Sequence, residues 1–368
     1  MLETEQNEAN KTLKQPFYTT LFNRYIFVDK DGNIDEDFIR LAKKQQNLTF
    51  DTRYLDPAFK DHLTTLTPFK EITFFDNYPD FSDSELFTDV ELNYEALLGR
   101  ILSTYMDGLR QLDTSGNYLV LCSNGSDSRI LTGCLARLRD EEGFNLDNFI
   151  FHCWGRAEKD SFLQMMHEKK IKNYTIMDDN GPDPYKLAPL DFCTYGFNDF
   201  SMGMKFWDEH PPKKYCLLSG NNASMFDKTF EYFLHSRSWF DTRDESVYRM
   251  KQIFNDLFFP NMQKKLIALL ASVPRKYKGI KDSRLQRDKL RTDLVFKLGL
   301  GNIPMQKTLI HFNLNDDIKK QWQQRYENSL FYKEYGVKLN FNKVLKEWWR
   351  FDNCLFCFAC TTYEKIFA

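Results

Sequence analysis

The chain has 368 residues, 42% apolar and 16% aromatic, so it can bury a sizeable core in two domains or one elaborated domain. Its formal net charge of −2 excludes a general electrostatic footprint for nucleic acid, and such a partner would need a local basic patch. No apolar run approaches the roughly 18 residues that span a bilayer, and residues 1–8 lack the segments of a signal peptide. We expect a cytoplasmic protein with no membrane partner, whose eight cysteines are thiols or metal ligands.

Residues 1–90 are predicted to form an N-terminal extension that is partly β. The apolar run at 25–28, followed by turn residues, predicts a strand and a tight hairpin, and the run at 72–75 predicts another strand. A calcium loop beginning at Asp29 is disfavoured, because Arg40 stands where that loop needs a glutamate. This extension is the candidate surface for a protein or nucleic-acid partner.

Residues 91–240 are predicted to form an α/β domain. Short apolar strands alternate with amphipathic helices, which favours a parallel sheet covered on both faces. Ligands of such sheets bind beyond the carboxyl ends of the strands. The predicted elements are helices at 93–112, 129–139 and 159–169, and strands at 118–122, 148–154, 174–177 and 214–218.

A small polar loop joins the strand at 118–122 to the next helix. It consists of Ser123, Asn124, Gly125, Ser126, Asp127 and Ser128. Glycine and asparagine tolerate positive φ, so the backbone can curl with its N–H groups pointing into a concavity at a helix N-terminus. Such a concavity suits a phosphate, and Asp127 is a candidate ligand for the Mg²⁺ that accompanies it. In the alternative, the serines and Asp127 only cap the helix.

Two other strand ends supply candidate residues. Cys153 and Trp154 end the strand at 148–154 and are candidates for an adenine or ribose wall, or for ordinary packing. Ser219, Gly220 and Asn221 follow the strand at 214–218. A neutral loop of this kind can bind a ligand through amides and hydroxyls but cannot supply a general base.

The six residues 123–128 resemble the S-G-G-x-D-S loop of the N-type ATP pyrophosphatases, the PP-loop superfamily of asparagine synthetase, GMP synthetase, NAD synthetase and the 7-cyano-7-deazaguanine synthase QueC. Asn124 departs from the pattern, since a glycine is usual there. The resemblance implies an adenine nucleotide α-hydrolase-like (HUP) domain that binds ATP and Mg²⁺ through this loop and Arg129, with Asp127 and Ser128 in catalytic roles. Residues 219–226 resemble the second signature of asparagine synthetase without its acidic residues.

Residues 241–368 are predicted to be mostly helical, with helical patterns at 247–259 and 262–272. The stretch from Lys276 to Arg291 is the most basic part of the chain, and it is either a solvated face or a clamp for a triphosphate. Lys297 and Lys307 are candidates for the lysine that neutralises a leaving pyrophosphate, and we assign Lys307 this catalytic role.

Three cysteines near the end of the chain have the spacing of a zinc site. Cys354, Cys357 and Cys360 form a C-x₂-C-x₂-C pattern of soft thiolate ligands. The pattern resembles the end of QueC, which has a fourth cysteine where this chain has Leu345. In the alternative, cysteines spaced by three on an aromatic helix form one buried stripe.

The resemblance implies an ATP-dependent adenylating ligase. It would activate a small-molecule or macromolecular carboxylate as acyl-AMP, release pyrophosphate, and form an amide or a nitrile in a QueC-like reaction. One alternative is an asparagine synthetase-like amide ligase, and another is a nucleotide-binding protein of the same fold without turnover. The enzyme hypotheses predict ATP-dependent pyrophosphate release that is lost in Asp127→Ala.

Overall fold

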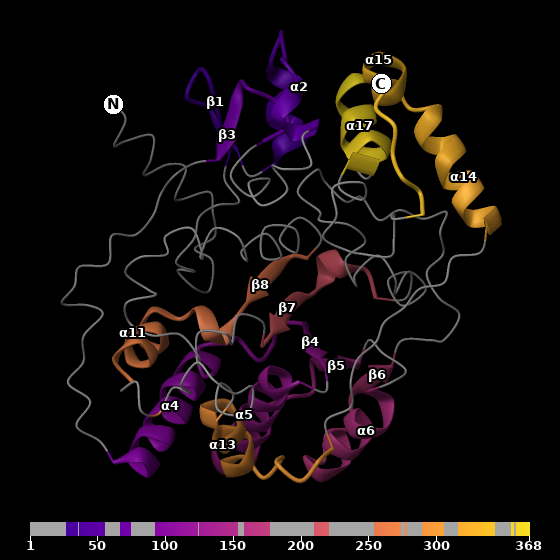
Figure 1. The fold of residues 1–368 in the computed structure, drawn as a ribbon. Helices are drawn as coiled ribbons and strands as arrows, with labels where there is room; N and C mark the ends of the chain where they lie inside the picture. The colour runs from indigo at the N-terminus through magenta and orange to yellow at the C-terminus, as the bar shows by residue number, and fades with distance from the viewer. Residues whose placement is uncertain are drawn as a thin grey trace.

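The computed structural model describes residues 27–35, 37–55, 67–74, 93–123, 125–153, 158–176, 210–220, 254–273, 277, 289–304, 316–342, 355–356 and 358–368. These residues form two groups with separate apolar cores. A parallel sheet with its helices makes up one group, and elements from both ends of the chain make up the other (Figure 1).

A five-stranded parallel sheet is the centre of the larger group. Its strands are β4 (Tyr118–Cys122), β5 (Phe149–Cys153), β6 (Tyr174–Ile176), β7 (Cys216–Ser219) and β8 (Asp256–Phe258). They lie in the order β6-β5-β4-β7-β8, so the direction in which strands are added reverses between β4 and β7. The predicted α/β class with a parallel sheet is confirmed, and the arrangement is Rossmann-like.

The described helices of this group lie on one side of the sheet (Figure 1). They are α4 (Tyr94–Leu109), α5 (Ser126–Glu142), α6 (Lys159–Glu168), α11 (Lys264–Ser272) and α13 (Lys289–Lys297). The predicted helix at 93–112 is α4, which begins where the Asn93 side chain accepts a hydrogen bond from Ala96 N at 2.8 Å. Its buried face includes Leu97, Ile101 and Leu109, and each fully buried leucine contributes about 1.5–3 kcal/mol.

Strand β8 corrects one prediction. The helical pattern at 247–259 predicted a helix, but residues 256–258 form the edge strand that pairs with β7. Leu257 and Phe258 are buried, and Pro260 opens a short turn of 3₁₀ helix. Periodicity does not separate so short an apolar run from a buried helix segment, and pairing with β7 decides the outcome.

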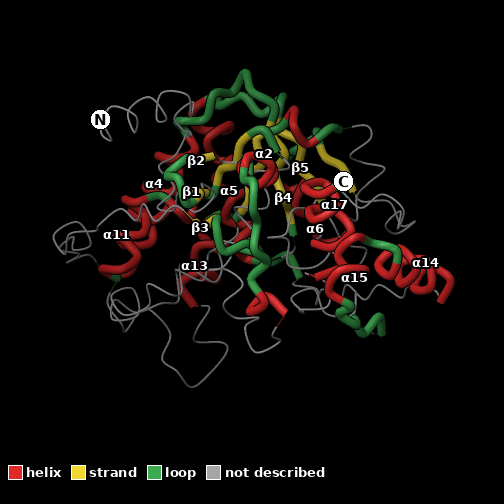
Figure 2. The backbone as a smooth tube through the Cα atoms, turned by 90° about the horizontal axis from the view of Figure 1, so that it is seen from above, coloured by secondary structure: helices red, strands yellow, loops and turns green. Residues whose placement is uncertain are grey.

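The smaller group brings together both ends of the chain. A three-stranded antiparallel sheet of β1 (Phe27–Asp29), β2 (Ile34–Asp35) and β3 (Ile72–Phe74) comes from the N-terminal part. Its helices are α2 (Phe38–Lys44), α14 (Asp316–Glu327), α15 (Leu330–Tyr335) and α17 (Glu364–Phe367), with a π-helical turn, η8 (Phe358–Tyr363), before α17. Helix α2 lies against α17 (Figure 2).

Three short 3₁₀ turns lie among the described residues. In the N-terminal part there is η1 (Thr52–Leu55), and beside the five-stranded sheet there are η5 (Pro212–Lys214), before β7, and η7 (Pro260–Met262), after β8.

Aromatic side chains form the core of this second group. Phe50 lies 5.3 Å from Phe331 and 5.7 Å from Phe358 between ring centroids, and Phe69 lies 6.2 Å from Phe358. The first and last parts of the chain, which the sequence analysis assigned to separate regions, therefore share one core.

The predicted hairpin after residue 28 is confirmed. The Asp29 carboxylate accepts hydrogen bonds from Asp31 N and Asn33 N, both at 2.9 Å, and from the Gln45 side chain at 2.6 Å. These bonds hold the turn between β1 and β2.

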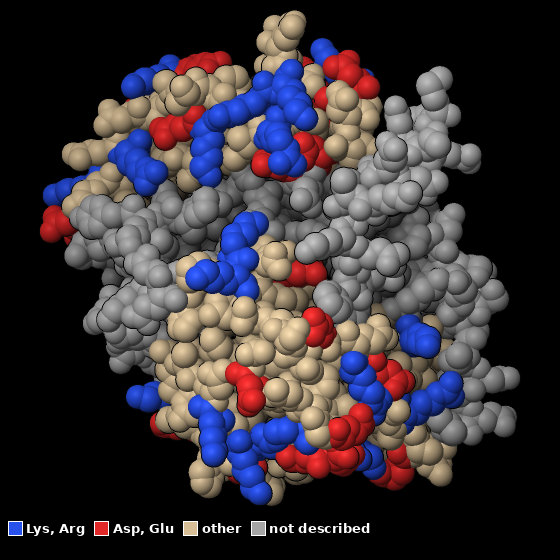
Figure 3. Space-filling view, turned by 180° about the vertical axis from the view of Figure 1, so that it is seen from behind, with Lys and Arg blue, Asp and Glu red and all other residues tan. Residues whose placement is uncertain are grey.

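Figure 3 shows Lys and Arg side chains intermingled with Asp and Glu on the face seen from behind. This distribution agrees with the nearly balanced charge of the chain. Among the helices that the structure describes, none combines the length and the apolar content needed to cross a membrane.

Candidate functional site

The loop at 123–128 lies where β4 ends and α5 begins. The Ser123 backbone N–H donates to Ser128 Oγ at 2.9 Å, and the two hydroxyl oxygens lie 3.0 Å apart. Ser123 Oγ also accepts from Gly125 N at 3.2 Å. Both hydroxyls therefore fasten the loop to the first turn of α5, which fixes its shape before any ligand arrives.

The start of α5 has no side-chain cap from its N-cap residue, because that residue is Gly125. The first N–H groups of a helix have no acceptor within the helix, and the helix dipole favours an anion in front of them. Ser126 and Asp127 in the first turn are partly exposed, so this end of the helix is accessible. An accessible helix start of this kind is a common place for an anion to bind in proteins, and the anion-binding interpretation stays a prediction beside the cap-only alternative.

The end of β7 lies against the same turn. Leu121 of β4 is in register with Ser219 of β7. A Cβ on Gly220 would lie 2.5 Å from the Asp127 carbonyl oxygen and 3.2 Å from Ser128 N, so only glycine permits this approach. Asn261 Nδ2 holds the Gly220 carbonyl from the other side at 2.6 Å. The structure thus brings Ser219 and Gly220 to the loop, as the sequence predicted.

Asp127 is paired with an arginine that lies far away in the sequence. Its Oδ1 is 3.2 Å from Arg291 Nη1 of α13, and the two side chains are 30% and 16% exposed. Arg291 belongs to the basic stretch for which a solvated face or a phosphate clamp was predicted. Its half-buried position beside the loop agrees with a clamp, and sequence reasoning did not single it out.

Arg129, predicted to bind the cofactor, points away from the loop opening. Its guanidinium is buried and donates to the carbonyls of Leu300, Ile303 and Pro304 at 3.1, 2.6 and 2.9 Å. The Ser161 hydroxyl of α6 also donates to the Pro304 carbonyl at 3.0 Å. Arg129 therefore ties the start of α5 to the segment after α13. Burial lowers the pKa of its guanidinium.

The end of β5 offers buried side chains. Cys153 is fully buried and is in register with Cys122, as expected for ordinary packing. His152 is also buried, with Nδ1 2.8 Å from Thr175 Oγ1, and burial lowers its pKa to about 3. Its imidazole is therefore neutral at pH 7 and brings no positive charge to the sheet edge.

Several predicted residues lie outside the described part of the chain. They are Asn124, Trp154, Asn221, Lys307, Cys354 and Cys357. Lys297 is described, but its Nζ pairs with Glu95 at 3.0 Å. It lies six residues beyond Arg291, about 9 Å farther along α13 at 1.5 Å per residue.

Cys360 is the one cysteine of the predicted zinc triplet that the structure describes. It lies in η8 among the apolar side chains of the second core, and burial raises the pKa of its thiol to about 12. This is the environment expected for the buried-stripe alternative. Among the described residues, no three His, Cys, Asp or Glu side chains are grouped to hold a metal.

The described residues define an α/β protein with a Rossmann-like parallel sheet. A polar loop follows the carboxyl end of β4, next to β7, where the strand order reverses. This is where open α/β sheets bind their ligands. No family model matches the chain, and no curated protein matches it.

Proposed function

We propose that this chain is an ATP-dependent adenylating enzyme with a HUP-like nucleotide-binding domain. The observation that carries the proposal is the meeting of three features at one place. They are the start of α5, which has no side-chain cap from Gly125, the close approach of Gly220, and the Asp127–Arg291 pair, all at the carboxyl ends of the neighbouring strands β4 and β7. Backbone N–H groups at such a crevice favour phosphate groups.

Each described residue of the loop has a separate task. The first turn of α5 receives the phosphates, while the hydroxyls of Ser123 and Ser128 keep the loop in shape. Arg291 offers a planar guanidinium to a phosphate once its bond to Asp127 opens. The Asp127 carboxylate would be the residue to hold Mg²⁺, and the ion would supply neutralisation of phosphate charge.

The reaction follows from the resemblance of the loop to the PP-loop enzymes. A carboxylate oxygen of the acceptor attacks the α-phosphorus of ATP, and the bond from that phosphorus to the bridging oxygen breaks. Pyrophosphate leaves, stabilised by the backbone N–H groups and the guanidinium, and acyl-AMP remains. Ammonia or an amine then displaces AMP to give an amide. A primary amide, formed from ammonia, becomes a nitrile when a second ATP adenylates its oxygen with release of pyrophosphate and that oxygen leaves with AMP.

A second candidate is a nucleotide-binding protein without turnover. Two observations favour it: Asp127 is already engaged by Arg291, and the described end of β7 brings Ser219 and Gly220 but no carboxylate. Both candidates use the same loop, so binding and turnover have to be measured separately.

The test measures ATP binding by calorimetry, with and without Mg²⁺, in wild type, Asp127→Asn and Arg291→Gln. Without Mg²⁺, Asp127→Asn should bind ATP more tightly, because it removes a negative charge and releases Arg291. With Mg²⁺, the same variant should bind more weakly. Arg291→Gln should weaken binding about tenfold or more in both conditions, as expected for a lost charge-assisted hydrogen bond.

Turnover is measured as exchange of labelled pyrophosphate into ATP across a panel of carboxylic acids. The enzyme hypothesis expects exchange with at least one acid, lost in Asp127→Asn, whereas the second candidate expects binding without exchange. Asp147→Asn and Arg137→Gln change exposed charges elsewhere and serve as matched controls. If neither loop variant differs from these controls in ATP affinity, the loop is not the nucleotide site.

A further inference from the structure

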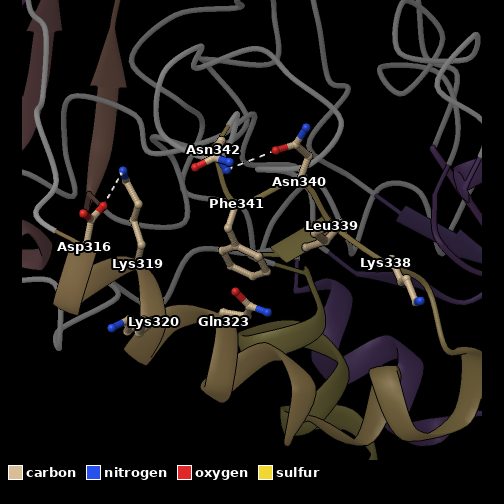
Figure 4. A pocket seen from close by; sticks show the side chains of 9 residues that line it. All are labelled: Asp316, Lys319, Lys320, Gln323, Lys338, Leu339, Asn340, Phe341 and Asn342. Atoms are coloured by element: carbon tan, nitrogen blue, oxygen red, sulfur yellow. Dashed lines mark hydrogen bonds and ion pairs between the residues drawn. The ribbon is translucent and has the colours of Figure 1, made fainter.

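A pocket of about 680 Å³ lies in the second group, between α14 and residues 338–342 (Figure 4). One wall is the side of α14 that carries Lys319, Lys320 and Gln323, and the other is the segment that follows α15. Both walls belong to the unit formed by the chain ends, because Trp322 and Tyr326 on the inner side of α14 lie in its aromatic core. The pocket is thus distinct from the loop between β4 and α5.

The pocket has an excess of positive charge. Lys319, Lys320 and Lys338 line it, against one carboxylate, Asp316. Asp316 is bound to Lys319 at 3.1 Å, and within the described part of the chain Lys320 and Lys338 make no ion pair. A ligand with more than one negative charge therefore complements these walls.

An aromatic side chain stands among these charges. Phe341 lies at the centre of the pocket in Figure 4, with Lys319 and Lys320 on one side and Lys338 on the other. Its ring is 6.0 Å from Tyr326 and 5.8 Å, edge to face, from Phe356. The core therefore holds the ring in place, while its remaining surface lines the pocket and can stack on a planar group.

Amide groups complete the lining. Gln323, Asn340 and Asn342 each bring a donor and an acceptor. Asn342 N donates to Asn340 Oδ1 at 3.1 Å, which fixes the turn that presents Phe341. Amides of this kind match the donors and acceptors on the edge of a nucleobase, whereas a simple anion would use neither the amide carbonyls nor the ring.

We propose that this pocket binds a nucleotide unit, with its phosphates on the lysines and its base stacked on Phe341. Ammonium groups along a phosphate path and an aromatic platform for the base are the combination that single-stranded nucleic acids require. A free nucleoside phosphate presents the same chemistry. An acidic peptide has the charge but not a planar base beside each charge.

The test uses the full chain and the fluorescence anisotropy of a labelled 12-nucleotide uridine oligomer, titrated at several salt concentrations. Lys319→Gln/Lys338→Gln should weaken binding and lower the slope of log affinity against log salt by roughly 1.4, about 0.7 for each lost phosphate contact. Phe341→Leu should weaken binding about tenfold and leave the salt slope unchanged. Competition by AMP, lost in Phe341→Leu, would identify a free nucleotide as the ligand, and its absence would identify the strand.

Matched controls separate local from general charge effects. Lys172→Gln/Lys214→Gln removes two exposed lysines outside the pocket and should leave affinity within twofold of wild type. Circular dichroism establishes that each variant is folded, and neither Lys319 nor Lys338 belongs to the aromatic core. The proposal is overturned if neither the oligomer nor, in calorimetry, AMP binds, if Phe341→Leu binds as wild type does, or if polyglutamate competes as well as the oligomer.

Discussion

Replacing Gly220 with alanine should push the end of β7 away from the start of α5. The added Cβ would lie 2.5 Å from the Asp127 carbonyl oxygen and 2.7 Å from the Asp127 carbonyl carbon. Both are backbone atoms, so neither can rotate out of the way. Ordinary contact begins at 3.4 Å, so the two elements must separate by about 0.9 Å.

The cost of this separation can be bounded. Forcing an extra methyl group into a well-packed site costs about 1–3 kcal/mol. Each kcal/mol lowers the melting temperature of a large domain by about 2–4 °C, so we expect a loss of roughly 2–12 °C. The hydrogen bond from Asn261 to the Gly220 carbonyl, 2.6 Å long, is stretched by the same movement. The affinity for ATP should fall as well, because the N–H groups of the loop lose their alignment.

Thermal and urea unfolding, followed by circular dichroism, measure the change in the free energy of unfolding. Gly99→Ala is the matched control, because a Cβ on Gly99 in α4 meets nothing within 4 Å. Alanine in a helix interior is favoured by roughly 0.5–1 kcal/mol, so this variant should be more stable than wild type. Equal stability of the two alanine variants would refute the close approach of β7 to α5.

Three further predictions concern buried groups. Tyr105→Phe should raise the melting temperature by about 2–4 °C in calorimetry, because the Tyr105 hydroxyl is buried with no hydrogen-bond partner among the described residues; a lower value would show that the hydroxyl is satisfied. The pKa of His152 is lowered to about 3 in the folded chain, so its imidazole binds a proton more readily when the chain is unfolded. The contribution of the neutral imidazole to the free energy of unfolding is therefore complete above about pH 6.5 and is lost as the pH falls towards 3. In urea unfolding at pH 7, 5.5 and 4.5, the free energy of unfolding should therefore fall less steeply with falling pH in His152→Gln than in wild type, by up to about 1.4 kcal/mol per pH unit. Parallel curves for the two proteins would contradict this. Cys360 should resist iodoacetamide until urea unfolds the chain, because burial raises its pKa to about 12; rapid labelling of the folded chain would contradict this. Elemental analysis of wild type and Cys360→Ser tests the predicted zinc separately, because zinc that wild type holds and the variant lacks would identify Cys360 as a ligand.

The elements that the sequence predicted well carry their signal locally. Helix α4 has its cap at Asn93 and an apolar stripe, and β4 is an apolar run followed by small polar residues. Strand β8 has three residues and is a strand because it pairs with β7. A residue's own neighbours do not encode such a pairing partner.

The site was predictable where it is a continuous segment. Ser123, Gly125 and Ser128 lie together because they are close in sequence, but Asp127 meets Arg291 across 164 residues. The basic stretch was visible, yet the packing of α13 on α5 decides which of its cations reaches the loop. Arg129 stands only two positions after Asp127, but two helical positions turn a side chain by about 200°, which points Arg129 into the interior.

The aromatic core shared by the two chain ends sets an order of events during synthesis. Phe50 and Phe69 are made early, whereas their partners Phe331 and Phe358 follow more than 250 residues later. At about 5–20 residues per second, the early aromatic side chains wait on the order of 15–50 s for those partners. The aromatic side chains of the early segment therefore lack their late partners for most of translation, whereas the last strand of the five-stranded sheet, β8, ends at Phe258 and is made before them.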